Sequence, residues 1–76
     1  MEGIVLKDKI RREVDRLLAQ ISRADSMIVA VKAGARAEGF VLGLEIVGDL
    51  SGEDAERLYA IMEEALEKRL VALIPT

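Results

Sequence analysis

Cysteine and histidine are both absent from this 76-residue sequence, and their absence removes two ways of stabilising a short chain. No disulfide can form, and a structural zinc ion finds none of its usual ligands. A domain of this length buries only roughly 60% of the surface that its unfolded chain exposes, so chains this short usually need a staple, a metal or a partner subunit. We therefore expect a single domain, residues 1–76, that is completed by another protein chain.

Aromatic residues are scarce as well, because Phe40 and Tyr59 are the only two and tryptophan is missing. Hydrophobic residues still make up 51% of the chain, so the core must be built from leucine, isoleucine, valine and alanine. Charged residues interrupt the apolar runs well before the roughly 20 residues that a bilayer span needs. Residues 1–9 have mixed charge and no apolar signal segment. We expect no membrane segment and a cytoplasmic location.

Motifs that carry chemistry are missing too. No histidine is present to activate a hydroxyl nucleophile, and neither a phosphate loop nor a dinucleotide-binding glycine motif occurs. Glu63, Glu64 and Glu67 cluster in the sequence, but metal sites inside helical bundles pair such glutamates with a histidine. We interpret the three as a solvated face, and we expect no enzymatic activity, no cofactor and no bound metal.

The first predicted helix covers about residues 6–22, where apolar residues recur at spacings of three and four between charged ones. The same heptad spacing runs on into the next segment, and neither glycine nor proline interrupts it before Gly34. The first two helices could therefore be continuous over residues 6–47, a length of roughly 63 Å. The apolar seam predicts an oligomer interface made of Ile10, Val14, Leu17, Ile21, Ile28 and Val31.

The last predicted helix covers about residues 51–72. Ser51 is a good N-cap residue, and Glu53 and Asp54 place negative charge in the first turn, where the helix dipole favours it. Leu50 can pack back on Ala55, and a proline at position 75 stops the helix. Together with the middle segment, this helix predicts a hairpin core made of Phe40, Leu44, Leu58, Met62 and Leu66.

The middle segment allows two interpretations. As strands it forms an antiparallel hairpin of residues 27–33 and 40–47, favoured by its β-branched residues, and the fold is then α+β in the order α-β-β-α. The connector between those strands lacks a tight-turn signal and contains good helix formers. As a helix over about residues 26–47 the segment ends at Gly48, a typical C-terminal cap. We favour the helix, and with it an all-α helical hairpin or three-helix domain.

In the helical interpretation the middle segment is apolar on two sides. Gly39 and Gly43 lie between these sides and are spaced so that another helix can approach closely. Lys32 and Arg36 lie on the same part of the helix surface as these glycines. Glu38 and Glu45 lie together on another part. The broad side holds small and large residues, Val29, Ala30, Ala33, Ala37, Phe40, Val41, Leu44 and Val47. The narrow side holds Ile28, Val31, Ala35, Leu42 and Ile46. Two neighbouring helices of one short chain cannot cover both sides, and exposed apolar patches are typical of protein interfaces.

Charge is distributed unevenly along a chain whose net charge is -3. Six basic residues oppose four acidic ones between positions 7 and 25, a difference of +2. From position 49 onward seven acidic residues oppose three basic ones, a difference of -4. The basic and acidic end helices could attract each other within one chain or between two. One outer face of the first helix is basic, with Lys9, Arg12, Arg16 and Arg23.

These patterns predict a small protein–protein interaction module that acts by self-association, as a dimer or higher homo-oligomer, and by binding a larger protein partner as an adaptor or regulator. The basic face supports an alternative, a nucleic-acid-associated regulator, although the acidic net charge and the absence of stacking aromatics there disfavour it. A structural subunit of a shell or virion is the third interpretation.

Overall fold

A computed structural model describes residues 3–75, which form three α-helices and no strand. Helix α1 spans Asp8–Arg23, α2 spans Met27–Ile46 and α3 spans Gly52–Leu73. The prediction of an all-α, three-helix fold is confirmed. The alternative hairpin of residues 27–33 and 40–47 is wrong, because both segments belong to one uninterrupted helix. In a helix, the middle segment has a continuous inner face that it can bury. This burial outweighs the preference of its β-branched residues for a strand.

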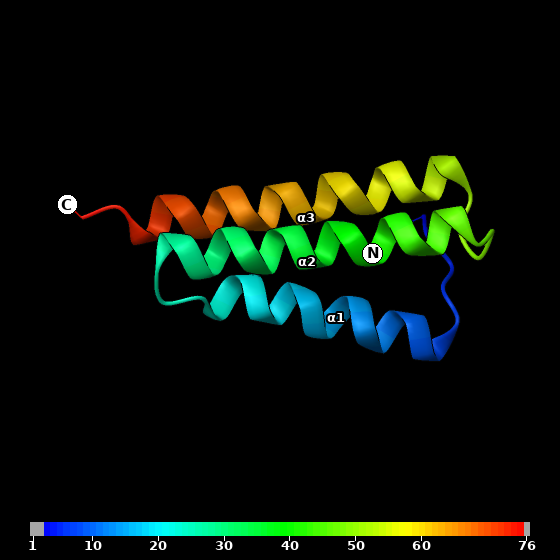
Figure 1. Ribbon diagram of the computed structural model, residues 1–76, viewed down its shortest axis with the longest axis horizontal. Coiled ribbons are helices and arrows are strands. Elements are labelled where there is room, and N and C mark those ends of the chain that lie inside the picture. The colour runs from blue at the N-terminus through cyan, green and yellow to red at the C-terminus, as the bar shows by residue number, and fades with distance from the viewer. Residues whose placement is uncertain (1–2, 76) are drawn as a thin grey trace.

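The helices run up, down and up, and Figure 1 shows α2 (green) between α1 and α3. Helix α2 packs against both neighbours, and α1 and α3 contact each other less extensively. The chain turns at residues 24–26, so α1 and α2 are two separate helices. A continuous helix over residues 6–47 would far exceed the longest dimension of the molecule, 42 Å.

Local hydrogen bonds explain where α2 and α3 begin. The Ser26 hydroxyl accepts a hydrogen bond from the Val29 N–H at 3.2 Å, and the Ser51 hydroxyl accepts one from the Asp54 N–H at 3.1 Å. Each bond satisfies one of the amide groups that a helix leaves free at its N-terminus. The predicted cap at Ser51 is therefore confirmed.

Helix α2 ends at a glycine, as its sequence predicts. Gly48 has a φ of +81°, a left-handed conformation that glycine adopts without strain. Its N–H bonds to the Glu45 carbonyl at 3.1 Å, and the Asp49 N–H bonds to the Leu44 carbonyl at 2.9 Å. This pair of bonds is a Schellman motif, which closes the helix and turns the chain toward α3.

All three helices contribute to one hydrophobic core. Leu50 joins this core just before α3, close in sequence to the buried Ala55, as expected of a hydrophobic staple. Ile4, which precedes α1, is also buried, and the Gly3 carbonyl accepts a hydrogen bond from Arg57 of α3 at 3.0 Å. The buried core residues from the helices are Val14, Leu17, Ile21, Ala33, Ala37, Val41, Ala55, Leu58 and Met62.

Helix α2 buries small residues and exposes large ones. Its buried residues are Ala30, Ala33, Gly34, Ala37 and Val41. A Cβ built at Gly34 would lie 2.9 Å from the Leu66 Cδ2, so this glycine lets α3 approach closely. The small inner face brings all three helices near one another, and Ile28, Val29, Val31, Leu42 and Ile46 of α2 remain exposed.

Candidate functional site

The six residues predicted as an oligomer interface are divided by the fold. Val14, Leu17 and Ile21 are buried within the chain and are at most 1% exposed, and Ile10 is half-buried against them. Ile28 and Val31 are exposed. The turn at residues 24–26 separates the two groups, although the heptad spacing runs through it. A second copy can therefore reach only the α2 part of the predicted seam without opening the core.

The five residues predicted as a hairpin core all lie in or against the hydrophobic core. Leu58 and Met62 are fully buried, and Phe40, Leu44 and Leu66 are half-buried beside them. These residues belong to α2 and α3, whose contact is the most extensive in the molecule. They stabilise the fold and leave other residues free for binding.

We call the outward side of α2 the outer face. Successive members are three or four residues apart, so all six fall within an arc of about 80° around the helix axis at 100° per residue. The outer face consists of Ile28, Val31, Ala35, Gly39, Leu42 and Ile46. All six are exposed, and the four large side chains among them are 69% (Ile28), 52% (Val31), 49% (Leu42) and 74% (Ile46) exposed. Within residues 3–75, α2 carries six of the ten large apolar residues that are exposed.

Two exposed glycines lie on or beside this face in the middle of α2. A Cβ built at Gly39 or at Gly43 meets no atom within 4 Å. Nothing within the described chain therefore requires glycine at either position, unlike Gly34, whose space is filled by Leu66. A glycine inside a helix is less favourable than alanine by about 1 kcal/mol. The two glycines thus lower the stability of α2 without a compensating contact inside the chain.

Basic side chains border the outer face on the side of α1. Lys32 and Arg36 lie roughly 60–100° around the helix from its centre, and the Arg36 guanidinium donates a hydrogen bond to Gln20 of α1 at 3.3 Å. Together with Arg16 and Arg23 they line a groove of about 550 Å³ between α1 and α2, and Asp25 adds one acidic side chain to this lining. The fold thus extends the predicted basic face onto α2. The sequence of the first helix alone does not indicate this extension.

The predicted basic face on α1 is partly neutralised. Lys9 and Arg12 are exposed on α1 but do not line the groove. Arg16 forms an ion pair with Glu13, whose carboxylate accepts two hydrogen bonds from the guanidinium. These bonds lower the pKa of Glu13 and raise that of Arg16, so both groups stay charged and largely offset each other.

Acidic side chains border the outer face on the opposite side, toward α3. Glu38 and Glu45 lie roughly 60–80° from its centre in the other direction. Both are near Tyr59 of α3: partial burial of the phenol raises the pKa of Tyr59, and the negative charges of Glu45 and Glu38 raise it further. The outer face of α2 is therefore an apolar strip with a basic flank and an acidic flank.

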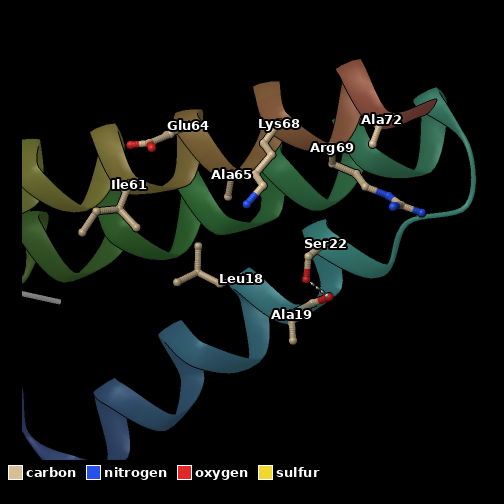
Figure 2. Close-up of a pocket in the computed structure, with 9 residues that line it drawn as sticks. All are labelled: Leu18, Ala19, Ser22, Ile61, Glu64, Ala65, Lys68, Arg69 and Ala72. Carbon is tan, nitrogen blue, oxygen red and sulfur yellow. Dashed lines mark hydrogen bonds between the residues drawn. The ribbon is translucent and has the colours of Figure 1, made fainter. Parts of the chain in front are cut away.

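A second groove, of about 560 Å³, lies between α1 and α3 (Figure 2). Leu18, Ile61 and Ala65 give it an apolar floor, and Lys68 and Arg69 extend from α3 beside it. The Arg69 Nε donates a hydrogen bond to the Ala24 carbonyl at 2.7 Å. Arg69 thus fastens the α1–α2 turn to α3. This groove was not predicted, because its residues come from helices that are distant in sequence.

Across residues 3–75, no group of three or more Asp, Glu, His or Cys side chains is arranged to hold a metal ion. The serines are engaged in local bonds, such as the bond that the Ser22 hydroxyl donates to the Ala19 carbonyl. None of the three described helices combines the length and apolar character needed to cross a membrane.

Comparison with known proteins identifies no relative. No protein-family model, no curated protein and no solved structure matches this chain. Any function must therefore be inferred from the chain's own structure.

Proposed function

We propose that this chain is a small, non-enzymatic protein–protein interaction module of the cytoplasm, which self-associates and binds a larger protein partner through the outer face of α2. The observation that carries the proposal is the concentration of exposed large apolar residues on this helix. Monomeric proteins rarely expose large contiguous apolar patches, and such patches are typical of interaction sites. The function is therefore that of an adaptor or regulator that acts by binding.

The shape of the outer face fits another helix as its ligand. An α-helix docks in a helical interface through residues at spacings of three and four, and that is how the exposed residues of α2 are spaced. Gly39 in the middle of the strip allows the backbones to approach closely. A helix packed there would also explain why glycine is retained at an open position.

Site-directed photocrosslinking in cells tests this proposal. A benzophenone amino acid replaces Leu42 on the outer face, and the control variant carries it at Ala60, an exposed position on α3. We expect crosslinks to a protein, a second copy included, from position 42 and not from position 60. Equal crosslinking from the two positions, or none from either, would overturn the proposal.

A second candidate function rests on the groove between α1 and α2, where Lys32 and Arg36 join Arg16 and Arg23. Clustered cations bind phosphates, so a nucleic-acid-associated regulator would be retained on heparin or DNA and released by salt. Recovery of the protein in the flow-through at low salt would eliminate this candidate. The Arg16–Glu13 ion pair and the net charge of -3 favour the interaction module.

A further inference from the structure

The side chains of the outer face of α2 are large at its two ends and small in its middle. Ile28 and Val31 lie toward one end, and Leu42 and Ile46 toward the other, with Ala35 and Gly39 between them. Two such helices can touch backbone to backbone at the small residues while the large side chains pack on either side of the contact. The face is therefore shaped to fit a copy of itself.

The charged flanks determine which orientation of the copy is favourable. When two identical helices pair in parallel about a twofold axis that runs along them, each flank meets the opposite flank of the partner. When they pair antiparallel, each flank meets its own counterpart, basic against basic and acidic against acidic. Lys32 and Arg36 form one flank and Glu38 and Glu45 form the other, so only the parallel pair is electrostatically complementary.

The positions of the charged residues along the axis of α2 agree with the parallel arrangement. Along α2, Arg36 and Glu38 are two residues apart, roughly 3 Å at the helical rise, and Lys32 and Glu38 are roughly 9 Å apart. Long side chains span such offsets, as they do between the flanking positions of parallel coiled coils. The whole chain shows the same asymmetry, because its excess of basic residues is in the α1 region and its excess of acidic residues follows α2.

We propose that two copies of this chain pair in parallel through the outer faces of their α2 helices, with Ala35 and Gly39 at the closest approach and the basic flank of each copy against the acidic flank of the other. This inference rests on the proposed function, and it names the partner and its orientation. The pair is isologous, so the same residues contribute from both copies and the interface is closed.

Single-cysteine variants test the orientation, because the natural chain contains no cysteine. Ala35→Cys and Leu42→Cys are made separately, and Ala60→Cys on α3 is the control. In a parallel pair each residue faces its own copy, so both variants form symmetric disulfides, which require Cα atoms within about 7 Å. In an antiparallel pair centred at Gly39, the two copies of residue 35 are roughly 12 Å apart and those of residue 42 roughly 9 Å apart along the axis.

Charge exchange tests the flanks independently. The double variants Lys32→Glu/Arg36→Glu and Glu38→Lys/Glu45→Lys should each self-associate at least roughly fivefold more weakly than the natural chain, and their equimolar mixture should recover the natural affinity. Light scattering over a hundredfold range of concentration measures all four samples.

The outcomes separate this inference from the proposed function. Symmetric disulfides at both positions, with recovery on mixing, support parallel self-pairing. Disulfides that form only when the Ala35→Cys and Leu42→Cys proteins are mixed indicate an antiparallel pair and overturn the inference. Association of the two mixed charge variants that is stronger than that of the natural chain does the same. A chain of 8.3 kDa at every concentration also overturns it. In that case crosslinks from position 42 to a different protein would leave the binding of a larger partner standing without self-association, and the absence of any crosslink would remove both.

Discussion

Replacing Gly39 by leucine should stabilise the isolated chain and at the same time prevent it from pairing. The space around Gly39 is open, so a larger side chain meets no atom of its own chain. Leucine is a much better helix former than glycine, and the exchange should raise the free energy of unfolding by about 0.8 kcal/mol. For a domain of this size that gain corresponds to a rise in Tm of roughly 3–6 °C.

The same leucine should separate two paired α2 helices. Gly39 lies at the proposed point of closest approach, where a side chain of four carbons holds the backbones apart and removes contacts on both sides. We expect self-association to weaken by roughly tenfold or more, equivalent to about 1.4 kcal/mol. Few surface substitutions change the stability of the monomer and the dimer in opposite directions, so this combination is diagnostic.

The assay combines two measurements. Thermal unfolding followed by circular dichroism is recorded at a concentration where both proteins are monomeric, and sedimentation velocity over a range of concentrations reports association. Gly34→Leu serves as the matched control, because Leu66 occupies the space beside Gly34 and overpacking there should destabilise the fold by about 1–3 kcal/mol. If Gly39→Leu lowers the Tm, or pairs as tightly as the natural chain, the role assigned to this glycine is refuted.

Three further outcomes follow from the helix caps, the α1–α2 turn and the single tyrosine. Ser51→Ala removes the hydroxyl that accepts the Asp54 N–H, and urea unfolding should show a loss of about 1 kcal/mol. Arg69→Met removes the donor to the Ala24 carbonyl while keeping an apolar stem, and we expect a loss of about 1–2 kcal/mol together with faster amide exchange in the turn. The pKa of Tyr59 is raised by burial and by two glutamates, so tyrosinate absorbance should appear above its ordinary pH range. Because folding raises the pKa of Tyr59, the neutral phenol contributes to the free energy of unfolding. This contribution is fully present below the pKa that Tyr59 has in the unfolded chain, and it is lost as the pH rises through the pKa that Tyr59 has in the folded chain.

Matched variants make these outcomes decisive. Ser22→Ala removes a hydroxyl that only bonds back to its own helix, and it should change stability far less than Ser51→Ala. Arg11→Met changes an exposed arginine of α1 and provides the reference for Arg69→Met. Equal effects within either pair would contradict the assigned hydrogen bonds. A tyrosine that titrates at its ordinary pKa, with no response to Glu45→Gln, would contradict the acidic flank.

Helix boundaries could be predicted from the sequence because their causes are local. Ser51 caps an amide three residues away, and Gly48 closes hydrogen bonds to carbonyls within five residues. Such bonds depend on neighbouring positions alone. The two apolar sides of the middle segment were visible for the same reason, since helical spacing can be counted along the chain. The sequence by itself therefore determined the first and last helices and most helix ends. For the middle segment it only favoured a helix, with its surplus of apolar surface, over the β-hairpin of residues 27–33 and 40–47.

Tertiary structure decided which apolar surface remains free. The heptad seam joined Ile21 to Ile28 as one interface, whereas the turn at residues 24–26 buries the first and exposes the second. Helix α2 turns its small residues inward, and the absence of a side chain at Gly34 lets Leu66 of α3 approach it closely. The Arg69 bond to the Ala24 carbonyl joins positions 45 residues apart, and no local pattern indicates it. Contacts of this kind depend on how whole helices fit together, so only the folded chain shows that the narrow apolar side of the middle segment stays exposed and that its basic flank adjoins α1.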